Sequence, residues 1–170
     1  MKKWLIKKKN GLFCKPGNFY IDPIKPVERA LITHAHTDHA RPNNKKILAT
    51  KETINIMKIR YGDNYCKTKQ NISYGESINI SGVRVKFIPA GHILGSAQIF
   101  LEYKGEKVIV SGDYKRKYDK TCIPFEVNNC NTFITEATFG LPIFIHPDDK
   151  LEAKKIIESI KTNAQQTHLI

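Results

Sequence analysis

The residues most suited to chemistry form one short run, in which three histidines and an aspartate follow the pattern HxHxDH. His34 and His36 are two residues apart, so in an extended segment their side chains project to the same side and can bind one metal ion. Asp38 and His39 follow where the chain turns toward a helix, and they point to a second metal position nearby. Imidazole and carboxylate ligands suit zinc, with manganese or iron as other metals that accept them. The alternative, a chance run of surface or core histidines, requires an improbable arrangement.

Two residues farther along the chain can complete a two-metal site. His92 lies in a loop with glycines at positions 91 and 95, whose tight turns aim the imidazole inward. Asp113 follows an apolar strand and a glycine, where a single carboxylate can bridge both metals. A structural histidine and a strand-end turn aspartate are the alternative interpretations. Two metals about 3.5–4 Å apart would hold a bridging hydroxide that attacks carbon or phosphorus, with Asp38 orienting the hydroxide and taking its proton.

Short strands separated by turns are expected to position these residues, which predicts a mixed α/β fold. The expected strands cover residues 19–21, 30–32, 47–49, 78–80, 83–87, 97–103, 108–110 and 132–135. A helix is predicted over 51–60 with Thr50 as its N-cap, and an amphipathic helix over 147–161. His168 to Ile170 begin a further apolar strand and stop there, which predicts that the chain is truncated.

The chain of 170 residues carries a net charge of +12, which favours a polyanionic partner such as nucleic acid. A coding bias toward lysine, isoleucine and asparagine is the alternative cause. Arg41 lies next to the metal run, and Lys115 and Arg116 lie next to Asp113, so these three cations are candidates for contacts with phosphates. A solvated charged turn is the alternative for each. The sequence contains no membrane-spanning apolar stretch and no signal-peptide pattern, so we expect a cytoplasmic protein with no membrane partner.

The cysteines do not form a metal-binding or disulfide pattern. They show no CxxC pair and no framework spacing, and they are Cys14, Cys66, Cys122 and Cys130. We therefore expect reduced and mostly buried side chains that pack as small hydrophobic residues.

Four segments together resemble the metallo-β-lactamase superfamily, and within it the β-CASP nuclease branch and the bacterial ligase-associated DNA exonucleases. They are ALITHAHTDHARP (30–42), PAGHILGSAQIFLE (89–102), SGDYKRKYDKTCIPFE (111–126) and FITEATFGLPIF (133–144). The match extends, with short gaps, from about Phe19 to the C-terminus. It implies a four-layer αββα sandwich with the metals at its edge. Residues 1–170 would be the N-terminal portion of this domain, with the β-CASP region starting near 136–170 and the returning half of the fold beyond the chain.

The resemblance also implies roles for individual residues. One zinc ion would be held by His34, His36, His92 and Asp113, and a second by Asp38, His39 and the shared Asp113. Asp22 matches a strand-end aspartate that supports the metal loop by hydrogen bonding. Glu136 matches the first acidic motif of the branch, which orients catalytic groups. The remaining histidines of the family belong to motifs beyond residue 170, and His146 and His168 do not match them.

Three functions remain open. The first is a DNA exonuclease in DNA repair, for which the resemblance implies DNA ligase or helicase partners. The second is an RNA-processing nuclease of the same branch, and comparing the hydrolysis of matched DNA and RNA strands would separate the two. The third is a fragment that binds metal and nucleic acid without turnover, supported by one metal per chain and no hydrolysis. Thioester or lactam hydrolysis is disfavoured, because the motifs after the metal run belong to the nuclease branch.

Overall fold

The computed structural model describes residues 3–145, 147–163 and 165 of the chain. The chain divides into two units, Met1–Glu136 and Ala137–Ile170. All the strands of the described residues lie in the first unit, and the second unit contains a helix. His146 and the strand expected at 168–170 lie outside the described residues.

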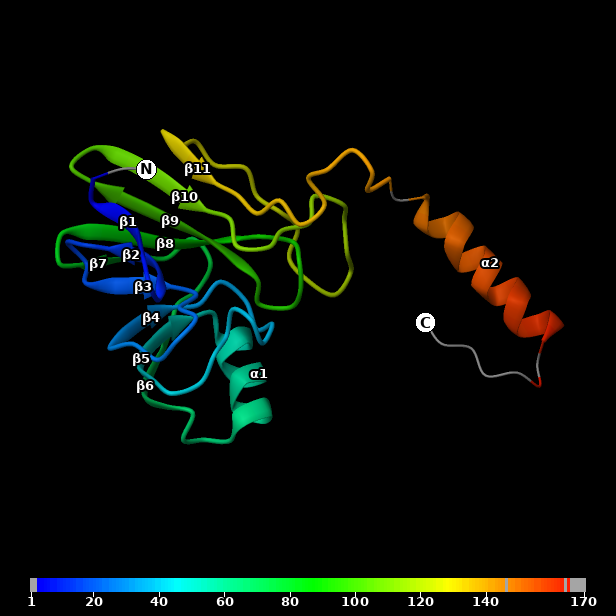
Figure 1. The fold of residues 1–170 in the computed structure, drawn as a ribbon, viewed down its shortest axis with the longest axis horizontal. Helices are drawn as coiled ribbons and strands as arrows, with labels where there is room; N and C mark the ends of the chain where they lie inside the picture. The colour runs from blue at the N-terminus through cyan, green and yellow to red at the C-terminus, as the bar shows by residue number, and fades with distance from the viewer. Residues whose placement is uncertain (1–2, 146, 164, 166–170) are drawn as a thin grey trace. The chain divides into compact units, whose positions relative to one another are not determined.

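The first half of the first unit folds into a six-stranded sheet whose spatial order follows the chain (Figure 1). Its strands are β1 (Leu5–Lys8), β2 (Gly11–Cys14), β3 (Phe19–Ile21), β4 (Arg29–Leu31), β5 (Asn44–Ala49) and β6 (Cys66–Asn71). Strands β1 to β3 pair antiparallel, whereas β3 to β6 pair parallel. The carboxyl ends of β3, β4 and β5 therefore lie at one edge of the sheet, where the loops that follow them can meet.

The second half of the first unit forms a five-stranded sheet in the order β11-β10-β9-β8-β7. Its strands are β7 (Ser77–Ile80), β8 (Val83–Pro89), β9 (Ala97–Tyr103), β10 (Glu106–Val110) and β11 (Thr132–Ile134). The pairs are antiparallel except for β10 and β11, which are parallel. The strands expected over 78–80 and 83–87 are confirmed, and they form a hairpin around Ser81 and Gly82 in which Ile80 pairs with Val83.

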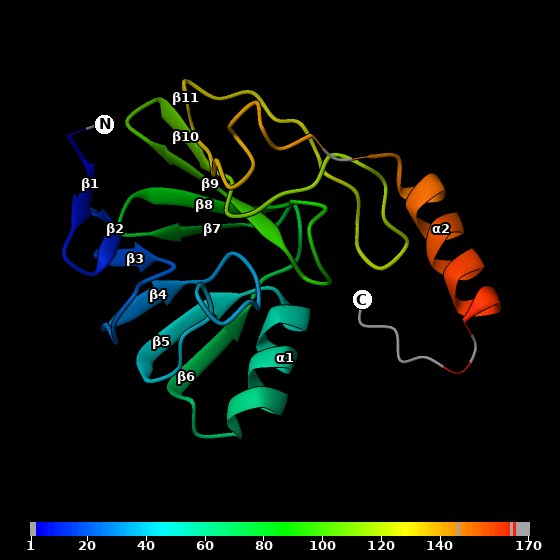
Figure 2. The ribbon, with the colours of Figure 1, turned by 45° about the vertical axis from the view of Figure 1, so that its right-hand side comes forward.

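The two sheets pack face to face around a shared apolar core (Figure 2). Leu31 and Leu48 enter this core from the first sheet, and Phe87 and Ile99 enter it from the second. These four side chains are buried, as expected for the inward-facing positions of strands in which alternate residues point to opposite faces. The strands at 19–21, 30–32 and 47–49 were predicted from the sequence and are confirmed to within a few residues.

Helix α1 (Lys51–Tyr61) covers the outer face of the first sheet beside β5 and β6 (Figure 2). The hydroxyl of Thr50 accepts a hydrogen bond from the backbone N–H of Thr53 at 3.3 Å, which confirms the predicted N-cap. Gly62 ends the helix with a φ of 78°, a conformation that favours glycine. Met57 is fully buried against the sheet. The helix thus begins at the edge where β3, β4 and β5 end.

The second unit contains helix α2 (Asp149–Thr162), close to the predicted helix over 147–161. Asp148 caps it by accepting hydrogen bonds from the backbone N–H groups of Lys150 and Leu151, at 2.9 and 3.3 Å. None of its residues is buried within the described part of the chain.

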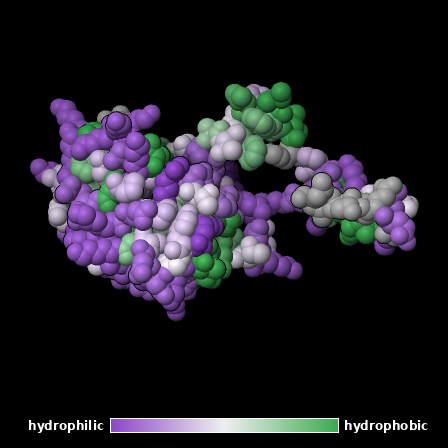
Figure 3. Space-filling model, turned by 60° about the horizontal axis from the view of Figure 1, so that its bottom comes forward, coloured by the Kyte–Doolittle hydropathy of each residue, from purple (hydrophilic) through white to green (hydrophobic). Residues whose placement is uncertain are grey.

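Figure 3 shows apolar surface confined to patches on a face that is otherwise mostly hydrophilic. No helix in the described part of the chain is long and apolar enough to cross a lipid bilayer.

Some sequence expectations were wrong. Strands β1, β2 and β6 were not predicted, and β6 is an edge strand of mostly exposed polar residues without apolar alternation. The chain after His39 does not turn toward a helix, because the single turn closed by the bond from Ala40 N–H to the His36 carbonyl leads directly into β5. The cysteines are free as expected, but only Cys14 is buried, and the others are half-buried.

Removal of one core side chain tests the sandwich. Ile99 is fully buried, whereas Ile59 on α1 is 86% exposed. Ile99→Ala should lower the free energy of unfolding by about 2–5 kcal/mol because it leaves a cavity between the sheets. The matched Ile59→Ala variant should stay within about 0.5 kcal/mol of the wild type. Urea unfolding followed by circular dichroism in EDTA measures both, and equal losses would contradict this packing.

Candidate metal centre

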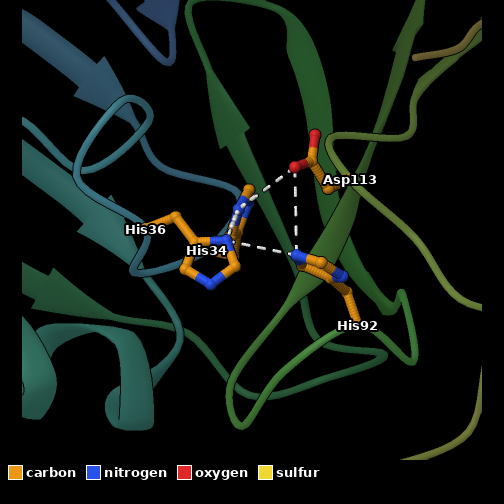
Figure 4. Close-up of side chains that lie close together, drawn as sticks. All are labelled: His34, His36, His92 and Asp113. Atoms are coloured by element: carbon orange, nitrogen blue, oxygen red, sulfur yellow. Dashed lines mark hydrogen bonds and ion pairs between the residues drawn. The ribbon is translucent and has the colours of Figure 1, made fainter. Parts of the chain in front are cut away.

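Loops from both sheets carry the predicted ligands to one edge of the sandwich (Figure 4). His34 and His36 lie in the loop after β4, His92 lies in the loop between β8 and β9, and Asp113 lies in the loop after β10. Their side chains point toward one another in Figure 4 although they are up to 79 positions apart in the chain, counted from 34 to 113. The fold therefore brings together donors that the sequence keeps far apart.

The first donor group has the spacing of a coordination sphere. Its donor atoms, from His34, His36, His92 and Asp113, all lie within 4.8 Å of one another. His36 Nδ1 is 3.0 Å from His34 Nε2 and 3.2 Å from His92 Nε2, and Asp113 Oδ2 is 3.8 Å from both Nε2 atoms. Ligands about 2.0–2.2 Å from a tetrahedral zinc ion lie about 3.3–3.6 Å from one another. The residues therefore fit a divalent metal, and they form a metal-binding site.

A second donor group lies on the other side of Asp113. His39 Nε2 is 3.4 Å from Asp113 Oδ1 and 3.5 Å from Asp38 Oδ2. Asp113 therefore presents Oδ2 to His34 and His92 and presents Oδ1 to His39. This orientation is the one that a carboxylate bridging two cations requires. Asp38 is 70% exposed, so its side chain can adjust its position.

Asp22, directly after β3, links the two groups by hydrogen bonds. Its Oδ1 accepts from the backbone N–H of Thr33 at 2.8 Å, and its Oδ2 accepts from the Thr33 hydroxyl at 2.6 Å and from His39 Nδ1 at 2.9 Å. The carboxylate can only accept, so His39 carries its proton on Nδ1. The Thr33 hydroxyl then accepts from His34 Nδ1 at 3.0 Å. Each ring, when neutral, therefore has an unprotonated Nε2 that faces the donor groups.

Histidine pKa values shift in opposite directions in the two donor groups. Burial, together with the neighbouring imidazoles, lowers the pKa of His34 to about 2. Burial also lowers the pKa of His92, and the charge of Asp113 opposes this shift. Burial acts to lower the pKa of His39 as well, but the hydrogen bond to Asp22 and the nearby carboxylates outweigh it and raise that pKa. His34 and His92 are therefore neutral and available as ligands, whereas a metal at His39 competes with a proton.

The loops of the two sheets pack closely against each other at Thr33. Gly112 has a φ of +57°, and a Cβ at this position would lie 2.7 Å from the Cβ and Oγ1 atoms of Thr33. The backbone N–H of Ala97, at the start of β9, donates to the Thr33 carbonyl at 2.8 Å. Because Gly112 precedes Asp113 and Thr33 precedes His34, this contact fixes the distance between a ligand from each sheet.

Hydrogen bonds with two buried hydroxyl groups hold the His92 loop in place. Ser96 Oγ accepts from the backbone N–H of His92 at 3.0 Å, and the Thr50 hydroxyl donates to the Gly95 carbonyl at 2.7 Å. Gly91 and Gly95 have φ values of 70° and 82°, as the predicted tight turns require. The N-terminus of α1 thus positions a ligand of the neighbouring sheet.

Glu136 borders a cavity of about 310 Å³ beside the second donor group. Asp22, Asp38, His39 and Asp113 also line this cavity. The backbone N–H of Tyr114 donates to Glu136 Oε1 at 3.2 Å. Glu136 is therefore placed next to the site and supports the loop that carries Asp113.

The three cations predicted to bind phosphates differ in their contacts and in their distance along the chain from the metal ligands. Arg41 Nε donates to the carbonyl of Asp38 at 3.3 Å, so this arginine lies at the metal loop. Lys115 Nζ pairs with Asp119 Oδ2 at 2.9 Å. Arg116 is exposed and lines a separate cavity on the second sheet. The Arg41 side chain is thus hydrogen bonded to the loop that carries His34 and His36, and the backbone N–H of Lys115 donates to the carbonyl of Ala90 in the His92 loop at 3.0 Å.

Several residues that shape the site were not singled out from the sequence. Thr33, Ser96 and Gly112 act through the contacts described above, and Arg60 on α1 donates from Nη1 to the carbonyl of Ala35. The only sequence signals were a threonine directly before the histidine run, a serine after a glycine, and a glycine directly before Asp113. The signals at Thr33 and Gly112 do not indicate a partner, because the residues that they contact lie on distant segments.

Comparison with known proteins identifies the relatives of this site. The chain is 34% identical over 157 residues to the RNase J-like protein of Methanocaldococcus jannaschii, covering 80% of the chain and 37% of that protein. It is 28% identical over 167 residues to the probable DNA ligase of Opitutus terrae, covering 96% of the chain and 16% of that protein. By sequence, the chain is similar to the β-CASP branch of the metallo-β-lactamase superfamily, as its motifs predicted.

The solved structure of the flavodiiron protein from Giardia intestinalis matches the fold of this chain with a TM-score of 0.50 and 20% identity. The match covers 59% of the chain and 31% of that structure. No family model matches the chain. The chain spans well under half of each curated relative described above, at 37% and 16% of their lengths.

Gly112→Ala tests the contact that sets the ligand spacing in the metal centre. The new Cβ would collide with Thr33, so Asp113 or His34 must shift, and zinc affinity should fall about tenfold or more. Gly105→Ala is the matched control, because Gly105 also has a positive φ, +77°, but its Cβ would meet nothing within 4 Å. Calorimetric zinc titration compares the two variants. Equal affinities would show that the Gly112 contact does not position the ligands.

Asp22→Asn tests the link between the two donor groups. An amide nitrogen would donate where the carboxylate accepts, so His39 and His34 would lose the proton arrangement that leaves Nε2 unprotonated. We expect metal affinity to fall about 10- to 100-fold. Asp63→Asn is the control, because Asp63 pairs with Lys58 on the surface at 2.9 Å. Unchanged zinc binding by Asp22→Asn would rule out this role for Asp22.

Proposed function

We propose that this chain is part of a metal-dependent nuclease that hydrolyses phosphodiester bonds in DNA and acts from strand ends. The observation that carries the proposal is the orientation of Asp113, whose Oδ2 lies 3.8 Å from His34 Nε2 and whose Oδ1 lies 3.4 Å from His39 Nε2. One carboxylate facing two donor groups is the arrangement of a two-metal hydrolytic site. The basic composition and the named relatives support a nucleic-acid substrate.

Two zinc ions are the proposed cofactors, and manganese or iron suit the same donors. The proposed ligands of one ion are His34, His36, His92 and Asp113, and those of the other are Asp38, His39 and Asp113. When bound, such a metal pair supplies Lewis-acid activation of water and of the phosphate group. The neutral state of His34, a consequence of its burial, makes its Nε2 available to the first ion over the ordinary pH range.

The carboxylates of the site have distinct proposed roles. Asp38 is exposed and lies 3.5 Å from His39, so it can reach a water between the donor groups, orient it and take its proton. Glu136 accepts from the Tyr114 N–H and keeps the segment after Asp113 in place. Asp22 stays hydrogen bonded to Thr33 and His39 and orients the ligands without contacting the substrate. Arg41, Lys115 and Arg116 are proposed to contact backbone phosphates.

DNA is the proposed substrate because the probable DNA ligase of Opitutus terrae matches 96% of the chain, and a DNA ligase is the proposed partner for the same reason. RNA is the second candidate, favoured by the higher identity, 34%, to a protein named RNase J-like. A chain that binds metal and nucleic acid without turnover is the third candidate.

End-labelled DNA and RNA strands of the same sequence test the proposal. With zinc or manganese, the wild-type chain should shorten the DNA strand from one end, whereas Asp113→Asn should reduce the rate by a factor of about 100 or more, because it weakens both metal positions. Asp63→Asn should retain the wild-type rate. Faster hydrolysis of RNA would favour the second candidate.

Metal counting separates the third candidate from the first two. Two ions per wild-type chain and fewer than one per Asp113→Asn chain would agree with a shared bridging ligand. One ion per wild-type chain with no hydrolysis of either strand would overturn the nuclease proposal. Hydrolysis that survives Asp113→Asn unchanged would place the chemistry elsewhere.

A further inference from the structure

A cavity of about 340 Å³ lies on the outer face of the second sheet. Ile99 and Leu101 of β9 face the core between the sheets, so the alternating residues Gln98 and Phe100 face outward. We call this cavity the aromatic pocket. Its lining includes Gln98, Tyr114, Arg116, Phe125, Asn128 and Phe133.

Three aromatic rings form the walls of the aromatic pocket. The ring centroids of Tyr114 and Phe125 are 5.2 Å apart with an interplanar angle of 38°, and those of Tyr114 and Phe133 are 6.2 Å apart at 74°. Phe133 is 43% exposed, and the other two rings are half-buried. Partly exposed rings at different tilts offer faces and edges on which a flat ligand can stack.

Gln98 gives the aromatic pocket a buried polar group. This side chain is 1% exposed, and its Nε2 donates to the carbonyl oxygens of Pro89 and Glu126 at 2.9 and 2.8 Å. Both partners can only accept, so the orientation of the amide is fixed. Among the described residues, no donor forms a hydrogen bond with Oε1. A buried carbonyl oxygen without a donor is costly, and a ligand N–H in the cavity can satisfy it.

The aromatic pocket is tied to the metal centre through the backbone. Tyr114 directly follows Asp113, and its N–H donates to Glu136 Oε1 at 3.2 Å. Gln98 directly follows Ala97, whose N–H donates to the Thr33 carbonyl at 2.8 Å. Both walls of the pocket therefore have fixed positions relative to the ligand loops.

We propose that the aromatic pocket binds one unpaired nucleobase of the substrate strand while the metal centre acts on a phosphodiester of the same strand. The rings stack on the base, Gln98 Oε1 accepts a hydrogen bond from a base N–H, and the exposed Arg116 contacts a backbone phosphate. This inference rests on the proposed nuclease function and narrows its substrate to single-stranded nucleic acid. A base in a duplex is already stacked and paired, so it cannot enter.

A nucleobase explains the pocket better than an apolar side chain from another segment would. An aliphatic group could fill the space between the rings, but it would leave Gln98 Oε1 without a donor. Every nucleobase has a flat face and at least one N–H group or amino group, so this recognition would tolerate different sequences.

Removal of single bases tests the proposal in the 170-residue chain. The probe is a short single-stranded DNA with phosphorothioate linkages that slow hydrolysis, carrying an abasic nucleotide at each terminal position in turn. Fluorescence anisotropy with the zinc-loaded chain at fixed salt measures the affinity. Affinity should fall about tenfold at one position and remain nearly unchanged at the others. Replacing adenine there with unsubstituted purine, which lacks the amino group, should cost about fivefold.

Variants of the pocket test whether the base that the abasic nucleotide lacks binds in the aromatic pocket. Phe133→Leu and Phe125→Leu keep the wall apolar but remove a ring, so the penalty for the abasic nucleotide should shrink to about twofold or less. Tyr118→Leu is the matched control, because Tyr118 is 68% exposed in the same loop and does not line the pocket. It should retain the full penalty. Circular dichroism and zinc content confirm that each variant is folded and loaded.

The outcomes separate this proposal from the nuclease proposal. Equal affinity for all abasic probes, or a full penalty in both phenylalanine variants, would overturn base binding in the pocket even if the chain hydrolyses DNA. A position-specific penalty that disappears in the variants would support the pocket even if no hydrolysis occurs. In that case only the catalytic proposal fails.

Discussion

The hydrogen bonds of one carboxylate determine how the donor groups are presented. Asp22 accepts from the Thr33 backbone, the Thr33 hydroxyl and His39 Nδ1, at 2.8, 2.6 and 2.9 Å. An imidazole coordinates a metal only through an unprotonated nitrogen, so the proton of each ring must be held on the opposite side. Asp22 holds the proton of His39 directly and that of His34 through Thr33. Without this arrangement, the same donor geometry would bind a metal more weakly.

The parallel pairing of β3, β4 and β5 makes this interaction available. Asp22 follows β3, the histidine run follows β4 and Thr50 follows β5, so all three reach the same edge of the sheet. The second sheet adds His92 and Asp113 from the loops after β8 and β10. The Gly112–Thr33 contact and the bond from Ala97 N–H to the Thr33 carbonyl then fix the two sheets relative to each other at the site. Thr33 thus takes part in both the orientation and the spacing of the ligands.

The sequence was most informative where the determinants are local. The HxHxDH run, the Thr50 cap and the strands on either side of Ser81–Gly82 depend on neighbouring residues, and the sequence predicts each of them. Strand β6 was missed because the residues of this edge strand are mostly exposed and do not need to alternate. The contacts of Thr33 with Asp22 and Gly112 span 11 and 79 positions, counted from 33 back to 22 and forward to 112. Their chemistry is ordinary, but only the sheet topology brings them together.

Charge distribution connects metal binding to substrate binding. The chain is strongly basic, yet the lining of the cavity beside the second donor group in the described residues contains four carboxylates and neither lysine nor arginine. The carboxylates belong to Asp22, Asp38, Asp113 and Glu136. A phosphodiester would be repelled from this cavity by Coulomb forces unless cations offset the charge. Bound metals would therefore be needed both for the chemistry and for entry of the phosphate. Basic residues elsewhere would attract a polyanion to the surface, but they would not offset the charge of the carboxylates in this cavity.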